Sequence, residues 1–138
     1  TGKQADKVYL PEGSAIQSLD ETYSVATAKT KEEQIRFGQR VYEANCQACH
    51  QTNGQGIPAA FPPLAKSDYL NANPLLGVDA IIQGLSGPIV VNKTTYNGVM
   101  PSMRLNDQDI ANVITFVLNN WDNKGGQISA EEVANRRH

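Results

Sequence analysis

The sequence predicts an all-α fold, because three capped segments carry apolar side chains at the helical period. These segments cover residues 30–45, 73–84 and 106–121. Apolar residues that recur every 3.6 positions predict helices with one buried face. The chain has 138 residues, of which 40% are hydrophobic, so we expect one domain with a small core.

Composition divides the chain into three parts. Residues 1–29 contain Pro11, Gly13 and scattered Ser and Thr, and they show no amphipathic period, which predicts a linker or tail. Residues 30–122 form the expected domain, and residues 123–138 form a C-terminal extension with a short helix. The chain begins at Thr1 without a signal peptide, which we expect of a processed chain or a domain cut from a larger protein.

The first helix begins at a capping box, with Thr30 as N-cap and Glu33 three residues later. We expect it to run to about Asn45. Turn residues and three prolines predict a loop over residues 51–66, followed by a single helical turn from Ser67 to Leu70.

The second long helix begins at Asn73-Pro74, with Asn as N-cap and Pro in the first turn, and ends near Gly84. Its inward residues are expected to be Leu75, Val78, Ile81 and Ile82. β-Branched residues on both sides of Asn92-Lys93 predict a small β-hairpin or extended loop over residues 86–99.

Asn106 is the expected N-cap of the last long helix. We expect Gly125-Gly126 to stop this helix, and a capping box of Ser129 and Glu132 to open the short terminal helix. The apolar positions of the long helix are Ile110, Val113, Ile114, Val117, Leu118 and Trp121.

The pentapeptide Cys46-Gln47-Ala48-Cys49-His50 is the C-x-x-C-H signature of covalent haem attachment. Each thiol can form one thioether bond to haem, and His50 then reaches the iron as proximal ligand. A structural zinc site needs four ligands, and a redox C-x-x-C motif needs a βαβ pattern, so both are disfavoured here. We therefore expect one haem c.

The second axial ligand of the iron comes from a short list of residues. His138 is the last residue of the chain, where ligation is disfavoured. Met100 and Met103 remain, and Met/His ligation is the arrangement of electron-transfer cytochromes c. We prefer Met100, which is expected to follow an irregular loop before Pro101, and keep Met103 as the alternative.

The net charge of −2 gives no indication of nucleic-acid binding, and no apolar run is long enough for a membrane span. Arg104 lies near the methionines, and we expect it to be a solvated charge or a haem propionate partner. A docking patch could be formed by the apolar residues Ile57, Ala59, Ala60 and Phe61. The alternative is that Phe61 belongs to the core.

From these residues the chain resembles class I bacterial cytochromes c. The order Gly38, Tyr42, Cys46, Cys49, His50 is similar to the first-helix pattern of that family. The resemblance implies three to five helices around one covalent haem, with Gly38 at the crossing with Ile114, Phe116 or Val117 of the last helix.

The resemblance also assigns haem-pocket roles. Phe61-Pro62-Pro63-Leu64 resembles the Pro-x-Leu loop of the family, so the Pro62 carbonyl would accept the ring N–H of His50 and Leu64 would pack on the haem. Tyr96 is also expected in the haem pocket. Met100 occupies the ligand position. Haem is attached to such motifs outside the bacterial cytoplasmic membrane, so the resemblance implies the periplasm.

A narrower resemblance concerns residues 87–101 together with the Trp121 and Gly125-Gly126 ending. They look like the cytochrome domain fused to the C-terminus of some copper nitrite reductases. The redox partner would then be a copper nitrite reductase domain, residues 1–29 the linker, and no catalysis would come from this chain alone. The alternatives are a stand-alone periplasmic electron carrier, or a haem enzyme or gas sensor with a displaceable methionine.

Overall fold

The structure is a computed structural model and describes residues 30–137. Three longer helices, three single-turn helices and one hairpin make up this part of the chain, where three to five helices were expected. The predicted linker over residues 1–29 lies outside the described residues. In chain order the elements are α2 (Lys31–Asn45), α3 (Gln47–His50), α4 (Asp68–Ala72), α5 (Leu75–Gln83), β2 (Leu85–Val91), β3 (Thr94–Met100), α6 (Asp107–Leu118) and α7 (Ala130–Ala134).

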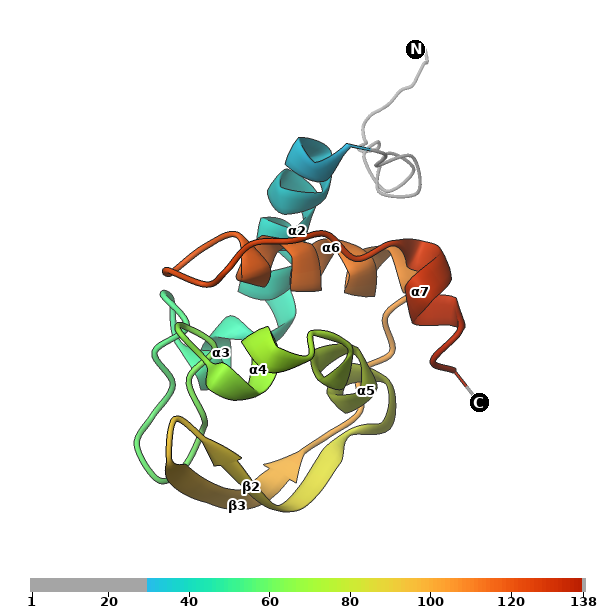
Figure 1. Ribbon diagram of the computed structural model, residues 1–138. Helices are drawn as coiled ribbons and strands as arrows, with labels where there is room; N and C mark the ends of the chain where they lie inside the picture. The colour runs from blue at the N-terminus through green and yellow to red at the C-terminus, as the bar shows by residue number, and fades with distance from the viewer. Residues whose placement is uncertain (1–29, 138) are drawn as a thin grey trace. The chain divides into compact units, whose positions relative to one another are not determined.

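Helices α2 and α6 cross, as Figure 1 shows. Gly38 is the residue of α2 that lies against α6 at this crossing. A Cβ atom on Gly38 would lie 2.0 Å from the Asn112 carbonyl oxygen and 2.8 Å from the Cβ of Phe116. The expected contact with Phe116 is therefore present, and Asn112 supplies the nearest backbone. Only glycine lets the two helices approach this closely.

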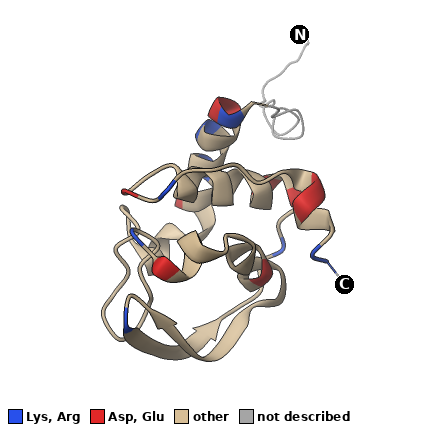
Figure 2. Cartoon of the chain, in the orientation of Figure 1, with Lys and Arg blue, Asp and Glu red and all other residues tan. Residues whose placement is uncertain are grey.

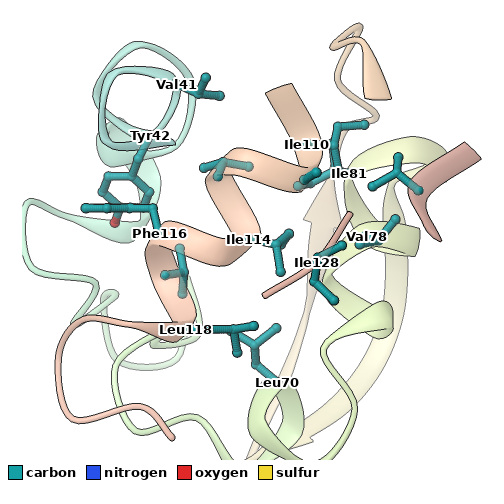
Figure 3. Packing of buried hydrophobic residues seen from close by; sticks show 14 residues of the cluster. Val41, Tyr42, Leu70, Val78, Ile81, Ile110, Ile114, Phe116, Leu118 and Ile128 are labelled. Atoms are coloured by element: carbon teal, nitrogen blue, oxygen red, sulfur yellow. The ribbon is translucent and has the colours of Figure 1, made fainter. Parts of the chain in front are cut away.

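The core surrounds α6, in which every residue from Ile110 to Leu118 is buried. A helix buried on all sides must be covered by several neighbours. Figure 3 shows side chains of α2, α4 and α5 and of the C-terminal segment packed around it. The labelled members of this cluster are Val41, Tyr42, Leu70, Val78, Ile81, Ile110, Ile114, Phe116, Leu118 and Ile128.

Helix α6 ends at Leu118, so the prediction that it continues through Trp121 to Gly125 is wrong. The side-chain amides of Asn119 and Asn120 each donate to the carbonyl four residues earlier, at 2.7 and 2.8 Å. The Gly125 N–H donates to the Leu118 carbonyl at 2.7 Å. These donors take the carbonyls that would otherwise be left unsatisfied at a helix end.

The C-terminal strap, residues 125–137, packs along α6. Its Ile128 carbonyl accepts from Gln34 Nε2 of α2 at 2.8 Å, and the Ile128 N–H donates to Thr115 Oγ1 of α6 at 3.0 Å. The predicted capping box of Ser129 and Glu132 is present and opens α7. Val133 of α7 is fully buried, so the strap is part of the core.

Helix α5 begins at Leu75 with Pro74 at its cap position, one residue later than predicted. Asn73 is extended, as expected for a residue before proline. Its side chain still accepts from the Leu75 N–H at 3.2 Å, so it satisfies a donor of the first turn. Gly84 ends the helix as predicted.

The predicted hairpin is present, and its strands extend over residues 85–91 and 94–100. Asn92 and Lys93 form the two-residue turn with φ angles of 51° and 68°. Two positive φ values are typical of the type I′ turn, whose twist matches that of paired strands. No helix in residues 30–137 is long and apolar enough to cross a membrane.

Candidate haem site

The C-x-x-C-H motif forms a single helical turn. Cys46 is the N-cap of α3, and its carbonyl accepts from the N–H groups of Cys49 and His50 at 3.2 and 3.0 Å. Residues three and four apart share one face of a helix, so this turn gathers both thiols and the imidazole. Neither cysteine is in a disulfide, and all three side chains line one cavity.

The ring of His50 is held by the loop that follows it. His50 Nδ1 lies 3.0 Å from the Pro62 carbonyl oxygen, so the contact that the resemblance implied is present. Gly56 donates its N–H to the His50 carbonyl at 3.0 Å and packs so closely that a Cβ atom would lie 2.3 Å from the Phe61 carbonyl oxygen. The loop therefore returns tightly over His50, and the ring keeps Nε2 for another partner.

Two adjoining cavities lie between the helices and the hairpin. Cys46, His50, Pro62 and Met100 line both of them, so they form one continuous site. The first cavity also contains Cys49, Phe61, Tyr96, Pro101 and Met103 in its walls. The second is completed by Tyr42, Leu64, Leu70, Ile81, Val91, Val113, Ile114 and Val117, among others.

Met100 is the last residue of β3, where it pairs with Leu85. The prediction that it follows an irregular loop is therefore wrong, and the irregular segment comes after it, over residues 101–106. Met100 lines both cavities, whereas Met103 lines only the first. Met103 is held through its backbone, which donates to the Ile81 carbonyl at 2.8 Å.

The other expected pocket residues also lie on the cavity walls. Tyr96 is 9% exposed and lines the first cavity, and the half-buried Leu64 lines the second. Sequence reasoning missed Leu85 and Ile89 of β2, which line both cavities. Alternation along residues 85–91 could have identified them, because every second residue of a strand faces the same side.

Burial sets the protonation of the free motif. It raises the pKa of the Cys46 thiol to about 11, and the neighbouring Cys49 adds to this rise. Burial lowers the pKa of His50, against the opposing effect of the bond to Pro62. A neutral imidazole is the form that binds a metal, so the environment of His50 suits ligation.

The loop and hairpin around the site are nearly free of charge. Residues 51–65 contain no charged side chain, and residues 80–103 contain only Lys93. Figure 2 shows this part of the molecule almost entirely tan, with the charges on other elements. Of the four residues expected in a docking patch, Ile57, Ala59 and Ala60 are exposed, and Phe61 is half-buried. Arg104 is exposed, as expected for a solvated charge.

The site fits a covalently bound haem. Two free thiols and an imidazole share one wall, Met100 at the end of β3 contributes a thioether to the lining, and the remaining lining is mainly apolar. A mostly helical fold with this arrangement defines a c-type cytochrome domain.

Residues 35–121 match the family described as Cytochrome c, and the chain belongs to this family. Its cofactor is haem c, covalently attached, and its function is electron transfer.

Similar proteins include both small cytochromes and parts of larger ones. Cytochrome c-552 of Thermus thermophilus is 38% identical over 117 residues, covering 72% of this chain and 83% of the relative. The cytochrome c subunit of the quinone alcohol dehydrogenase from Gluconobacter oxydans is 30% identical over 137 residues, covering 93% of this chain but 27% of the relative. Cytochrome c6 of Gracilaria tenuistipitata var. liui is 34% identical over 89 residues, or 62% of this chain.

Proposed function

We propose that Cys46 and Cys49 form the thioether bonds to haem and that His50 and Met100 are the two axial ligands. One observation carries the ligand assignment: Met100 and His50 line both halves of the cavity, while Met103 lines one. Bound haem would supply an iron that alternates between the ferrous and ferric states. A neutral thioether favours ferrous iron and so raises the reduction potential.

The surrounding residues would keep the coordination fixed while the electron moves. The Pro62 carbonyl would accept a hydrogen bond from the Nδ1–H of His50 and so hold the ring in one orientation. Leu64 and Tyr96 would pack on the haem and exclude water. A coordination shell closed on both sides suits electron transfer, because no ligand has to leave.

The ferric absorption spectrum tests the assignment. Met-ligated ferric haem has a weak long-wavelength band, which should vanish in Met100→Ala and persist in Met103→Ala. Loss of the band in Met103→Ala alone would transfer the role to Met103. A wild-type spectrum without the band would refute methionine ligation altogether.

The mouth of the first cavity is the proposed docking surface. Ala60 and Val99 line this cavity and are exposed, Val99 by 75%, and Ile57 is 39% exposed nearby on the same loop as Ala60. The surrounding segments are nearly uncharged. A weak and transient electron-transfer partner would therefore meet an apolar, neutral surface at the haem edge.

The partner that we propose is a copper nitrite reductase domain in the periplasm, to which this chain passes electrons during denitrification. The support is the resemblance of residues 87–101 and of the Trp121 and Gly125-Gly126 ending to cytochrome domains fused to such enzymes. Residues 1–29 would be the tether, and tethering raises the local concentration of donor beside acceptor.

The rate at which purified copper nitrite reductase oxidises the ferrous protein tests this partner. The ferrous protein should be oxidised by the enzyme, and faster at low concentration when residues 1–29 join the two. Equal rates with and without the linker would exclude the tether. A lack of any oxidation by the copper enzyme would exclude this partner and leave electron transfer itself untouched.

The second candidate function is that of a stand-alone periplasmic carrier. It is favoured by the similarity to cytochrome c-552 of Thermus thermophilus, because the match covers 83% of that relative's length. Such a carrier would be oxidised by a separate acceptor at a rate proportional to acceptor concentration. The genomic reading frame before Thr1 distinguishes the two candidates directly.

A further inference from the structure

The hairpin is one wall of the haem cavity. Successive residues of β2 alternate in exposure, and Leu85, Ile89 and Val91 face the cavity while Val90 is 56% exposed. On β3, Tyr96 lines the first cavity and Met100 lines both. A two-stranded hairpin is marginally stable by itself in water, so its position depends on what holds its ends.

The tip of the hairpin is joined to α4 by two reciprocal hydrogen bonds. The Asp68 N–H donates to Asn92 Oδ1 at 2.9 Å, and the Asn92 N–H donates to Asp68 Oδ1 at 2.7 Å. Asp68 is the first residue of α4 and Asn92 is the first residue of the hairpin turn. We name this pair the hairpin latch. It bridges 24 positions of sequence, and its sequence neighbours Ser67, Tyr69 and Val91 line the second cavity.

The opposite end of the hairpin carries Met100. Seven cross-strand pairs, from Leu85–Met100 to Val91–Thr94, connect the latch end to the methionine end. The root of the hairpin is held by the chain itself and by close packing, since a Cβ atom on Gly84 would lie 2.8 Å from the Met100 carbonyl oxygen. Movement of the tip away from α4 would therefore pull on the strand that ends at Met100.

We propose that Asp68 and Asn92 are positioning residues, which hold the hairpin over the cavity and so keep Met100 opposite His50. This inference rests on the proposed His50/Met100 ligation. Neither side chain lines the cavity, and both act through the paired strands. Displacement of the methionine by an external ligand would require the hairpin to move, and the latch opposes that movement.

Imidazole affinity of the ferric holoprotein tests the latch. Asn92→Gly removes the Oδ1 acceptor but keeps a residue that tolerates φ of 51°. We expect imidazole to bind about 5-fold more tightly to this variant, which corresponds to one lost hydrogen bond of ordinary net strength. Lys93→Gly is the matched control, because it alters the same turn at φ of 68° without touching the latch. Its affinity should stay within about 2-fold of wild type.

A second pair of variants tests the other half of the latch. Asp68→Ala loses the acceptor for the Asn92 N–H, whereas Asp68→Asn keeps an oxygen at that place. Imidazole should bind more tightly to Asp68→Ala, and Asp68→Asn should restore the wild-type affinity. If Asn92→Gly and Asp68→Ala lower the melting temperature but leave imidazole affinity unchanged, the latch stabilises the fold without positioning Met100, and the inference is overturned. A missing long-wavelength band in the wild-type protein would instead refute the ligation on which the inference rests.

Discussion

The crossing of α2 and α6 predicts a severe effect of the smallest substitution, Gly38→Ala. The new Cβ atom would lie 2.0 Å from the Asn112 carbonyl oxygen, and ordinary contact begins at 3.4 Å, so the helices must separate by up to 1.4 Å. Overpacking of this kind costs about 1–3 kcal/mol. We expect a cost at the upper end of this range, because the atoms that clash with the new Cβ belong to the backbone of Asn112 and cannot rotate away as a side chain could. Alanine has a higher helix propensity than glycine, which offsets about 1 kcal/mol of this cost. The expected net loss is about 2 kcal/mol.

Urea unfolding of the holoprotein, followed by circular dichroism, measures this loss. For a domain of about 100 residues the same loss lowers the melting temperature by roughly 8–16 °C. Gln39→Ala is the control, because this neighbouring residue is exposed on the same helix and its substitution removes one exposed hydrogen bond, to Glu43, which should cost little. A Gly38→Ala protein as stable as Gln39→Ala would refute the close crossing of the two helices.

Three further predictions concern α6 and the strap. Asn106 accepts from the Asp109 N–H at 2.7 Å, so Asn106→Ala should cost about 1 kcal/mol in thermal unfolding, and Asn106→Ser should cost little. Burial raises the pKa of Asp109 above its usual 3.8, so wild-type stability should fall as pH rises from about 4 through the folded-state pKa. Melting temperatures of Asp109→Asn should lack this fall, and a parallel pH profile would contradict it. Thr115→Val leaves the buried Ile128 N–H without its acceptor and should cost about 1–3 kcal/mol in urea unfolding, whereas Thr115→Ser should retain the hydrogen bond.

Signals confined to a few residues predicted the fold well. The predicted caps at Asn106 and Ser129 are confirmed. They could be predicted because the side-chain acceptor and the N–H that donates to it are only three residues apart. The hairpin turn at Asn92-Lys93 follows from local preferences in the same way. The C-x-x-C-H motif indicated haem because spacing within one helical turn determines which side chains meet.

Features that depend on distant segments could not be predicted. The apolar period continued to Trp121, but asparagine side chains end α6 at Leu118, and the Trp121 ring instead packs 5.2 Å from that of Tyr42. The position of Met100 within a strand depends on its pairing with Leu85, fifteen residues earlier. No local pattern indicated that the strap would share hydrogen bonds with Gln34 of α2.

The two walls of the cavity differ in how they would hold the cofactor. The proposed covalent bonds both arise from the N-cap and the body of α3, within four residues, whereas the hairpin wall would contribute contacts and one ligand. Retention of haem and adjustment of its chemistry would therefore reside in separate segments. Mutations on the inward face of β2 or β3 could change the reduction potential during evolution while the two proposed thioether bonds stay in place, so one scaffold can serve partners of different potential.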